Sequence, residues 1–294
     1  MNENLLFAAA MRESDPMYDA AVVSAYGTEV WAYGQSNFLN NSHSVTKFLI
    51  AAGVGMLCDR GAVSLADPVI SYLDPADLPA GLDPNWRRVT VETALQHKTG
   101  IDKIPFGIDD ADSRQKIGDD FLRYILSLPV PYEPGTYYRY SDAAYYLLGC
   151  VIDRAAGKPA ADFIRDNIAG PLHWEQWAAA CCPMGRLIGG GGLFIRAADI
   201  AKLGFVYANG GVYEGKRLLS ESWIRSAMEK DYACTRFRDT DIFVKTGAHG
   251  QMVAFSALRR VAAAWHGYSA EDGNNRNDRL LEAFYAHLEA YYPL

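Results

Sequence analysis

A serine and a lysine three residues apart open a long apolar stretch of the chain. Residues 41–57 read NSHSVTKFLIAAGVGML, so that Ser44 is followed by Lys47. Residues three apart share a face of a helix, and the lysine amine can therefore meet the serine hydroxyl. The apolar residues that follow predict burial, which disfavours the charged ammonium form of the amine. The pair could act as a nucleophile and its proton acceptor.

A simpler interpretation gives this pair no chemistry. Ser44 would cap the helix, and Lys47 would extend its charged end to solvent. A chain of this length contains about one Ser-x-x-Lys by chance, so the motif is weak by itself. Ser113 and Lys116 repeat the spacing among five nearby aspartates, and we expect that lysine to be solvated and protonated.

A second candidate group is Tyr140-Ser141-Asp142, which follows a Pro-Gly turn and precedes an apolar helix. A phenol held near Lys47 could relay a proton, because a nearby ammonium favours the phenolate. A packing role is the alternative, since the chain has 18 tyrosines and most of them must be structural.

Other chemistries lack their motifs. The chain has no Gly-x-Ser-x-Gly and no His-Glu-x-x-His, and its six histidines are scattered. The glycine run 189–192 is not followed by the Gly-Lys-Ser/Thr of a phosphate loop, so it predicts a close approach of backbone segments. We therefore expect neither a metal nor an organic cofactor.

The composition predicts an ordinary soluble globular protein. The net charge is −7 and no basic patch occurs, which argues against a nucleic-acid partner. No apolar run reaches the roughly 18 residues of a membrane span. Five cysteines without Cys-x-x-Cys, and a start without a basic leader, predict a cytoplasmic location. No feature specifies an oligomeric state.

The elements that must position these residues form an α/β fold of the α+β type. Two strands joined at Gly27-Thr28 lie near the start, and paired strands within 249–268 lie near the end, followed by a helix over 278–291. A helix over 4–12 and one from Ser44 to about Arg60 complete the N-terminal part. We expect one antiparallel sheet built from residues 1–62 together with 184–294, flanked by helices, with 63–183 inserted as a mainly helical lobe.

The order of these motifs resembles the serine β-lactamase-related family, which includes class C β-lactamases, DD-peptidases, esterases and amide hydrolases. The segment GAHGQMVAF is most similar to the branch with 6-aminohexanoate-dimer hydrolases. The matching segments, in the family's order, are HSVTKFLIAAGVGMLCDRGAVSLADPVISYL, VTVETALQHKTGI, PGTYYRYSDAAYYLLGCVIDRAAGKPAADFI and GGGGLFIRAADIAKLGFVYANGGVYEGKRLLSESWI.

The resemblance implies the two-lobed penicillin-recognising fold and assigns roles to three residues. Ser44 is then the acylated nucleophile, Lys47 its proton acceptor and Tyr140 the relay to the leaving group. The base is assigned to the Lys47–Tyr140 pair rather than to one member. Asp142 stands where many relatives carry Asn, and its pairing with Lys47 would either position that lysine or blunt it.

The family's third motif lies on a strand that edges the site, and its backbone N–H joins that of Ser44 in an oxyanion hole. We favour His249-Gly250-Gln251 for this motif, with the Gln251 N–H as the second donor. Lys245-Thr246-Gly247 is the alternative. Lys98-Thr99-Gly100 matches literally but stands too early in the family's order.

The resulting hypothesis is a serine hydrolase that cleaves an ester or amide bond of a small molecule through an acyl-enzyme on Ser44. Hydrolysis of β-lactams is the second choice among enzymes. The competing hypothesis is a catalytically silent, penicillin-binding-like ligand-binding protein, which the Asp142 substitution and the ambiguous third motif favour.

Overall fold

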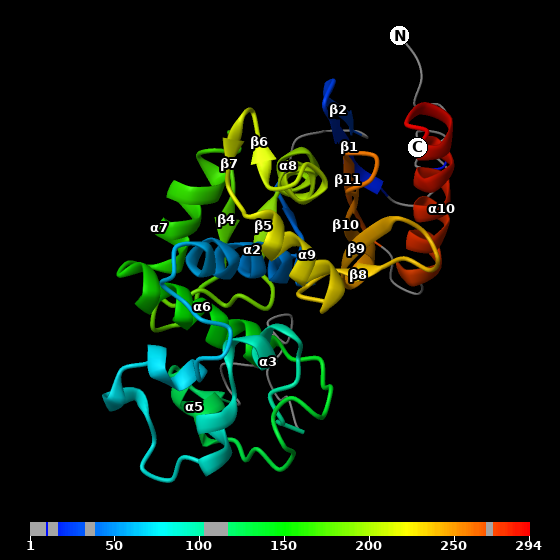
Figure 1. The fold of residues 1–294 in the computed structure, drawn as a ribbon. Helices are drawn as coiled ribbons and strands as arrows, with labels where there is room; N and C mark the ends of the chain where they lie inside the picture. Colours follow the sequence, from blue (N-terminus) through cyan, green and yellow to red (C-terminus); the bar gives the residue numbers. More distant parts are fainter. Residues whose placement is uncertain (1–9, 11–16, 33–38, 103–116, 269–272) are drawn as a thin grey trace.

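The computed structural model describes residues 10, 17–32, 39–102, 117–268 and 273–294 (Figure 1). The helix expected over 4–12 lies outside these residues except for Ala10. Ser113 and Lys116, the second copy of the Ser-x-x-Lys spacing, also lie outside them.

One antiparallel sheet contains strands from both ends of the chain, as predicted. β1, near the start, pairs with β11, near the end, over most of their length. The predicted N-terminal hairpin is β1–β2, but its turn lies at Ala25-Tyr26, and Gly27-Thr28 already belongs to β2. The predicted pair near the C-terminus is β10–β11. The strands in spatial order are β2 (Gly27–Ala32), β1 (Met17–Ser24), β11 (Val261–Gly267), β10 (Gln251–Ser256), β9 (Ile242–Gly247) and β8 (Thr235–Arg236).

Helices cover both faces of this sheet (Figure 1). α8 (Ala197–Ala208) packs against β1, β10 and β11 on one face, and α10 (Gly273–Tyr291) lies on the other. Alternate residues of β11 divide between the two sides, because successive strand residues point to opposite faces. Ala262 and Ala264 belong to the core beneath α8, whereas Ala263 and Trp265 pack with α10.

The central helix α2 (Thr46–Asp59) is buried on nearly all sides. Every residue from Thr46 to Leu57 is buried, as the almost continuous apolar sequence predicted. α6 (Asp142–Ala156) packs on one side, and Trp223 of α9 (Glu221–Glu229) lies against Gly55 on another. A single 3-10 turn, η1 (His43–Val45), precedes α2 and carries Ser44; we call it the Ser44 turn.

The remaining elements are short. Residues 63–183 contain mainly brief helices, as predicted, and the division of the chain at 63 and 183 stays a prediction. One apolar core includes residues from both sides of those limits. The short elements are β3 (Asn40–Asn41), η2 (Val69–Tyr72), η3 (Pro75–Asp77), η4 (Pro84–Arg88), α3 (Val91–Leu95), α5 (Phe121–Ser127), α7 (Ala160–Ile164), η5 (Arg165–Ala169), β4 (Ala178–Ala179), β5 (Leu193–Ile195), β6 (Val212–Tyr213), β7 (Lys216–Arg217) and η6 (Ala248–Gly250).

One helix boundary differs from the prediction, and one strand was not predicted. α10 begins at Gly273 rather than at Asp278. β9 is a strand for which the sequence gives no alternation signal, because Ile242, Phe243 and Val244 are buried in succession. Among the described helices, none combines the length and apolarity that crossing a bilayer requires.

Candidate active site

Ser44 and Lys47 meet, as their spacing predicted. The Ser44 turn places the serine half-buried at the entrance to α2, and Lys47 follows in the first turn of that helix. The Lys47 Nζ donates a hydrogen bond to the Ser44 Oγ at 3.1 Å. The lysine is 0% exposed, so its amine does not extend to solvent. The interpretation of Lys47 as a surface-reaching side chain is therefore wrong.

Two further acceptors surround the same amine. Lys47 Nζ lies 2.5 Å from Asp142 Oδ1 and 2.5 Å from the Gly190 carbonyl oxygen. With the Ser44 hydroxyl these make three acceptors, which match the three hydrogens of an ammonium group. These contacts therefore suit the charged ammonium form, and not the uncharged amine that burial alone would favour. The reason is the Asp142 carboxylate, whose negative charge compensates the burial of the positive one.

Local sequence explains why Asp142 and Gly190 can approach this closely. Asp142 is the first residue of α6, and the hydroxyl of Ser141 caps that helix by accepting from the Ala144 N–H. A Cβ on Gly190 would lie 2.7 Å from the Asp142 Cβ, and Gly189 has a φ of +68°. The close backbone approach predicted for the glycine run 189–192 is confirmed.

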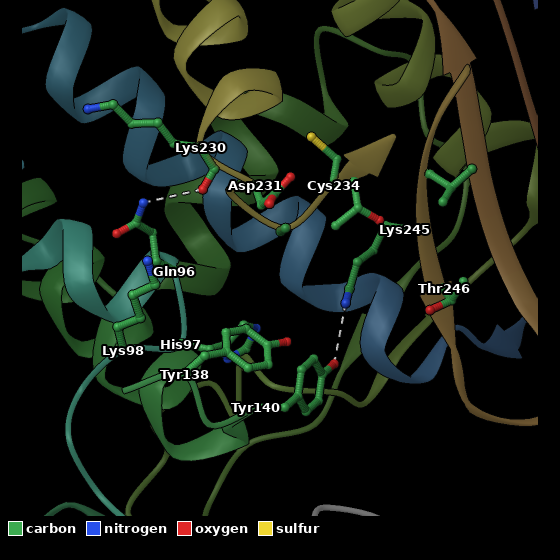
Figure 2. Close-up of a pocket in the computed structure, with 13 residues that line it drawn as sticks. Gln96, His97, Lys98, Tyr138, Tyr140, Lys230, Asp231, Cys234, Lys245 and Thr246 are labelled. Atoms are coloured by element: carbon green, nitrogen blue, oxygen red, sulfur yellow. Dashed lines mark hydrogen bonds between the residues drawn. The ribbon is translucent and has the colours of Figure 1, made fainter. Parts of the chain in front are cut away.

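Tyr140 lies between two lysines. Its hydroxyl accepts from the Lys245 Nζ at 3.3 Å (Figure 2). The Lys47 Nζ lies 4.7 Å and the Lys245 Nζ 5.0 Å from the centre of its ring. Burial by itself raises the pKa of Tyr140, but the charges of Lys245 and Lys47 outweigh it and lower the pKa below its usual value. Tyr140 therefore loses its proton to form the phenolate more easily than a free tyrosine does.

His97 holds Tyr140 in place and was not found from the sequence. Its ring stacks on the Tyr140 ring with centroids 4.4 Å apart. Its Nδ1 accepts from the Ser141 N–H at 3.0 Å. Burial, Lys245 and Lys47 lower the pKa of His97 to about 3, so the ring is neutral near pH 7. No spacing signal connects His97 to Tyr140, because the contact depends on how the loop after α3 folds back.

The two candidates for the third motif lie next to each other, one at the end of β9 and the other in the turn that follows it. Lys245, the alternative, lies on β9 and reaches Tyr140. Gly247, at the end of the same strand, faces the segment before Ser44: a Cβ there would lie 2.4 Å from the Ser42 carbonyl oxygen. The choice between Lys245-Thr246-Gly247 and the favoured His249-Gly250-Gln251 stays a prediction.

His249, Gly250 and Gln251 form the turn from β9 into β10. The His249 ring stacks on Tyr268 and lies edge-on to His43, with centroids 5.0 Å and 5.1 Å away. The Gln251 side chain is buried and exchanges two hydrogen bonds with the Gly267 backbone, at 2.6 Å and 3.1 Å. That amide is thus committed to joining β10 to β11.

A cavity of about 260 Å³ opens beside Tyr140 and Lys245 (Figure 2). Tyr140 and Lys245 line this cavity, but Ser44 does not. Lys98, which the sequence order excluded from the site, contributes to its wall together with Lys230 and Lys245. The lining residues are Gln96, His97, Lys98, Tyr138, Tyr140, Lys230, Asp231, Ala233, Cys234, Thr235, Val244, Lys245 and Thr246.

The Cys234 thiol in the cavity wall does not compete with Ser44 as a nucleophile. Burial raises the pKa of the Cys234 thiol to about 12, which leaves it protonated. Within the described ranges, no cluster of His, Cys, Asp and Glu side chains is placed to hold a metal ion.

Known proteins are similar to this chain in sequence and in fold. Esterase EstB of Burkholderia gladioli is 30% identical over 192 residues, which cover 57% of this chain and 48% of that protein. A 6-aminohexanoate-dimer hydrolase of Paenarthrobacter ureafaciens is 24% identical over 220 residues, covering 69% of this chain and 55% of the hydrolase. The chain therefore spans about half the length of these relatives.

A penicillin-binding protein homolog from Caulobacter crescentus has the same fold, with a TM-score of 0.76 over 97% of both chains at 19% identity. The model of the Beta-lactamase family matches residues 37–282. That range includes Ser44, Lys47, Tyr140 and Lys245, and it confirms the resemblance found in the sequence. The chain belongs to the Beta-lactamase family.

Proposed function

We propose that this protein is a serine hydrolase that cleaves an ester or amide bond through an acyl-enzyme on Ser44. One observation carries the proposal: the Ser44 hydroxyl is bonded to a buried lysine beside a phenol whose pKa is lowered. A nucleophile, a cation and a proton acceptor thus lie side by side, with the Lys47 Nζ 4.7 Å from the centre of the Tyr140 ring.

The contacts of Lys47 divide the roles between the two candidate bases. Its three acceptors suit an ammonium, which cannot take another proton, so Tyr140 as phenolate accepts the proton of Ser44. The Ser44 Oγ forms a bond to the substrate carbonyl carbon. The bond from that carbon to the leaving oxygen or nitrogen breaks, and Tyr140 returns the proton to the leaving group. Water then gives a proton to Tyr140 and attacks the acyl carbon. The bond from that carbon to the Ser44 Oγ breaks, the acid leaves, and Tyr140 returns the proton to Ser44.

The developing oxyanion needs two N–H donors. The Ser44 N–H is the first. We infer that the second comes from the turn 247–251, because Gly247 packs directly against the segment before Ser44. The Gln251 N–H, favoured from the sequence, belongs to this turn.

The substrate is a small molecule with an anionic group. Three lysines line the cavity with Asp231 as its single acidic residue, and one of them, Lys230, is already paired with Glu92. Lys98 and Lys245 are therefore the charges that would bind the anionic group. An ester fits the similarity to esterase EstB, and an amide fits that to the 6-aminohexanoate-dimer hydrolase. The absence of nucleic-acid and membrane partners, and a cytoplasmic location, stay predictions.

Replacing Ser44 by Ala removes the attacking oxygen. We expect Ser44→Ala to lose hydrolysis of p-nitrophenyl butyrate and labelling by a fluorophosphonate probe, with rates at least about 10³-fold below wild type. Ser113→Ala, at the second Ser-x-x-Lys, is the matched control and should keep both. Labelling that persists in Ser44→Ala contradicts the nucleophile. A wild type that is neither labelled nor active supports the silent ligand-binding alternative.

Replacing Lys245 tests the phenolate. Activity should be lost as the pH falls through the pKa of Tyr140, because protonation removes the base. Lys245→Met removes a charge that lowers this pKa, so the rising limb of kcat/KM against pH should move to higher pH. Lys98→Met, which removes a charge from the same cavity without a bond to Tyr140, should move it less. An unmoved limb in Lys245→Met argues against Tyr140 as the base.

Replacing Asp142 tests the buried ion pair. Asp142→Ala leaves the Lys47 charge without its counter-ion and should lower the free energy of unfolding by about 3 kcal/mol, measured by urea denaturation. Asp142→Asn keeps an acceptor oxygen and should lose less. Asp166→Ala breaks the exposed pair with Lys158 and serves as control, with a much smaller loss. Equal losses in Asp142→Ala and Asp166→Ala would show that the buried pair has no special role.

A further inference from the structure

A buried serine, histidine and aspartate are hydrogen-bonded in series directly behind the nucleophile. Ser42 Oγ lies 2.9 Å from His266 Nε2, and His266 Nδ1 lies 2.9 Å from Asp19 Oδ1. The three residues are 0%, 1% and 4% exposed, in that order. None of them belongs to the group around Lys47, and we call them the Ser42 relay.

The hydrogen bonds at the Asp19 end of the relay have a defined direction. The second carboxylate oxygen of Asp19 accepts from the Ala197 N–H at 2.7 Å, which leaves the first to accept from His266. A carboxylate only accepts, so His266 donates from Nδ1. The other ring nitrogen, Nε2, forms the hydrogen bond with the Ser42 hydroxyl. Every polar atom along the relay has a partner, as buried polar groups require.

The relay is not a second catalytic centre, although its residue types are those of a Ser-His-Asp triad. A triad serine must reach the substrate carbonyl. Ser42 is 0% exposed and does not line the cavity beside Tyr140, so no substrate can reach its hydroxyl. Its effect must pass through the backbone that it holds.

The backbone of Ser42 touches both sides of the proposed oxyanion hole. Its carbonyl oxygen accepts from the Val45 N–H at 3.0 Å, which closes the Ser44 turn. The same oxygen packs on Gly247, where a Cβ would lie 2.4 Å away. Its N–H donates to the Leu193 carbonyl at 2.7 Å. One peptide thus sets the position of the nucleophile and the end of β9 together.

Sheet register brings the two distant relay members together. Asp19 on β1 lies opposite His266 on β11, next to a shift in the strand pairing between Met17 and Asp19. Gln251 bonds to Gly267, the neighbour of His266, and so fixes β10 to the same point. The strands β1 and β11, which lie near the two ends of the chain, are thereby connected to the segment before Ser44 through the Ser42 side chain.

We propose that Asp19, His266 and Ser42 are positioning residues that fix the Ser44 turn against the end of β9. This inference rests on the proposed hydrolase function, because the distance that it controls matters for attack by Ser44. Removing the Ser42 hydroxyl breaks the side-chain hydrogen bond from this segment to β11 and leaves the His266 Nε2 without that partner. A misplacement of about 1 Å at a reacting group lowers a rate by up to about 10²-fold.

Three variants test the relay. Ser42→Ala removes one buried hydroxyl, and Asp19→Asn keeps the volume while removing the carboxylate to which His266 Nδ1 donates. Ser256→Ala is the matched control: Ser256 is also 0% exposed and also loses a hydrogen bond, to Asp241, on the sheet away from Ser44. The measurements are kcat and KM for p-nitrophenyl butyrate, the rate constant of fluorophosphonate labelling, and Tm.

We expect kcat and the labelling rate constant to fall by about 10- to 100-fold in Ser42→Ala and Asp19→Asn, with KM changed less than about twofold. Ser256→Ala should lower Tm about as much as Ser42→Ala does, but it should keep the wild-type kcat and the wild-type rate constant of labelling. Rates in Ser42→Ala and Asp19→Asn that equal those of Ser256→Ala overturn the relay as a positioning device.

A crystal structure of Ser42→Ala separates failure of the relay from failure of the proposed function. The distance from Lys47 Nζ to Ser44 Oγ, 3.1 Å in the native protein, should lengthen in the variant. A wild type without activity or labelling refutes the hydrolase, and the relay is then judged on this distance alone. An unchanged distance, with Gly247 still packed on the residue 42 carbonyl, refutes the relay.

Discussion

The arrangement of the site depends on one buried ammonium group. Lys47 has no contact with solvent, so its charge is stable only if the protein supplies an opposite charge and an acceptor for each hydrogen. Asp142 provides the charge, and Gly190 and Ser44 provide the other two acceptors. These three groups come from α6, the glycine-rich segment and the Ser44 turn. Three distant parts of the chain must therefore assemble correctly before the charge can be buried.

The same charge determines the chemistry. An ammonium that already uses its three hydrogens cannot be the base, but it can stabilise negative charge on its neighbours. Its effect on Tyr140 adds to that of Lys245 and outweighs the burial that would otherwise raise the pKa of the phenol. In the mechanism that we propose, Asp142 in place of the Asn of many relatives positions Lys47 rather than blunting the site, because the phenol takes the proton. His97, neutral and stacked on the phenol, fixes its orientation.

Local and long-range contacts differ in how well the sequence predicted them. Ser44 and Lys47 are three residues apart on one helical entrance, so their contact followed from geometry alone. The sheet from both chain ends followed from the strand patterns and from the resemblance. Lys245 was placed second because the segment AHGQMVAF fits the family's strand entry better and leaves the expected strand length after it. The strand of Lys245 shows no alternation, since Ile242, Phe243 and Val244 are buried in succession. His97 and the Ser42 relay join residues far apart in sequence, and such contacts depend on loop conformation and strand register, which spacing does not encode.

The most direct test of the central claim is to trap the acyl-enzyme and locate the acyl group. Wild-type protein is mixed with p-nitrophenyl butyrate, quenched in acid within the first turnover, digested, and analysed by peptide mass spectrometry. We predict a mass increase of one butyryl group on the peptide that contains Ser44, assigned to that residue by fragmentation. A butyryl group on another side chain, or steady turnover without any acylated peptide, would contradict the role of Ser44 as the nucleophile held by Lys47.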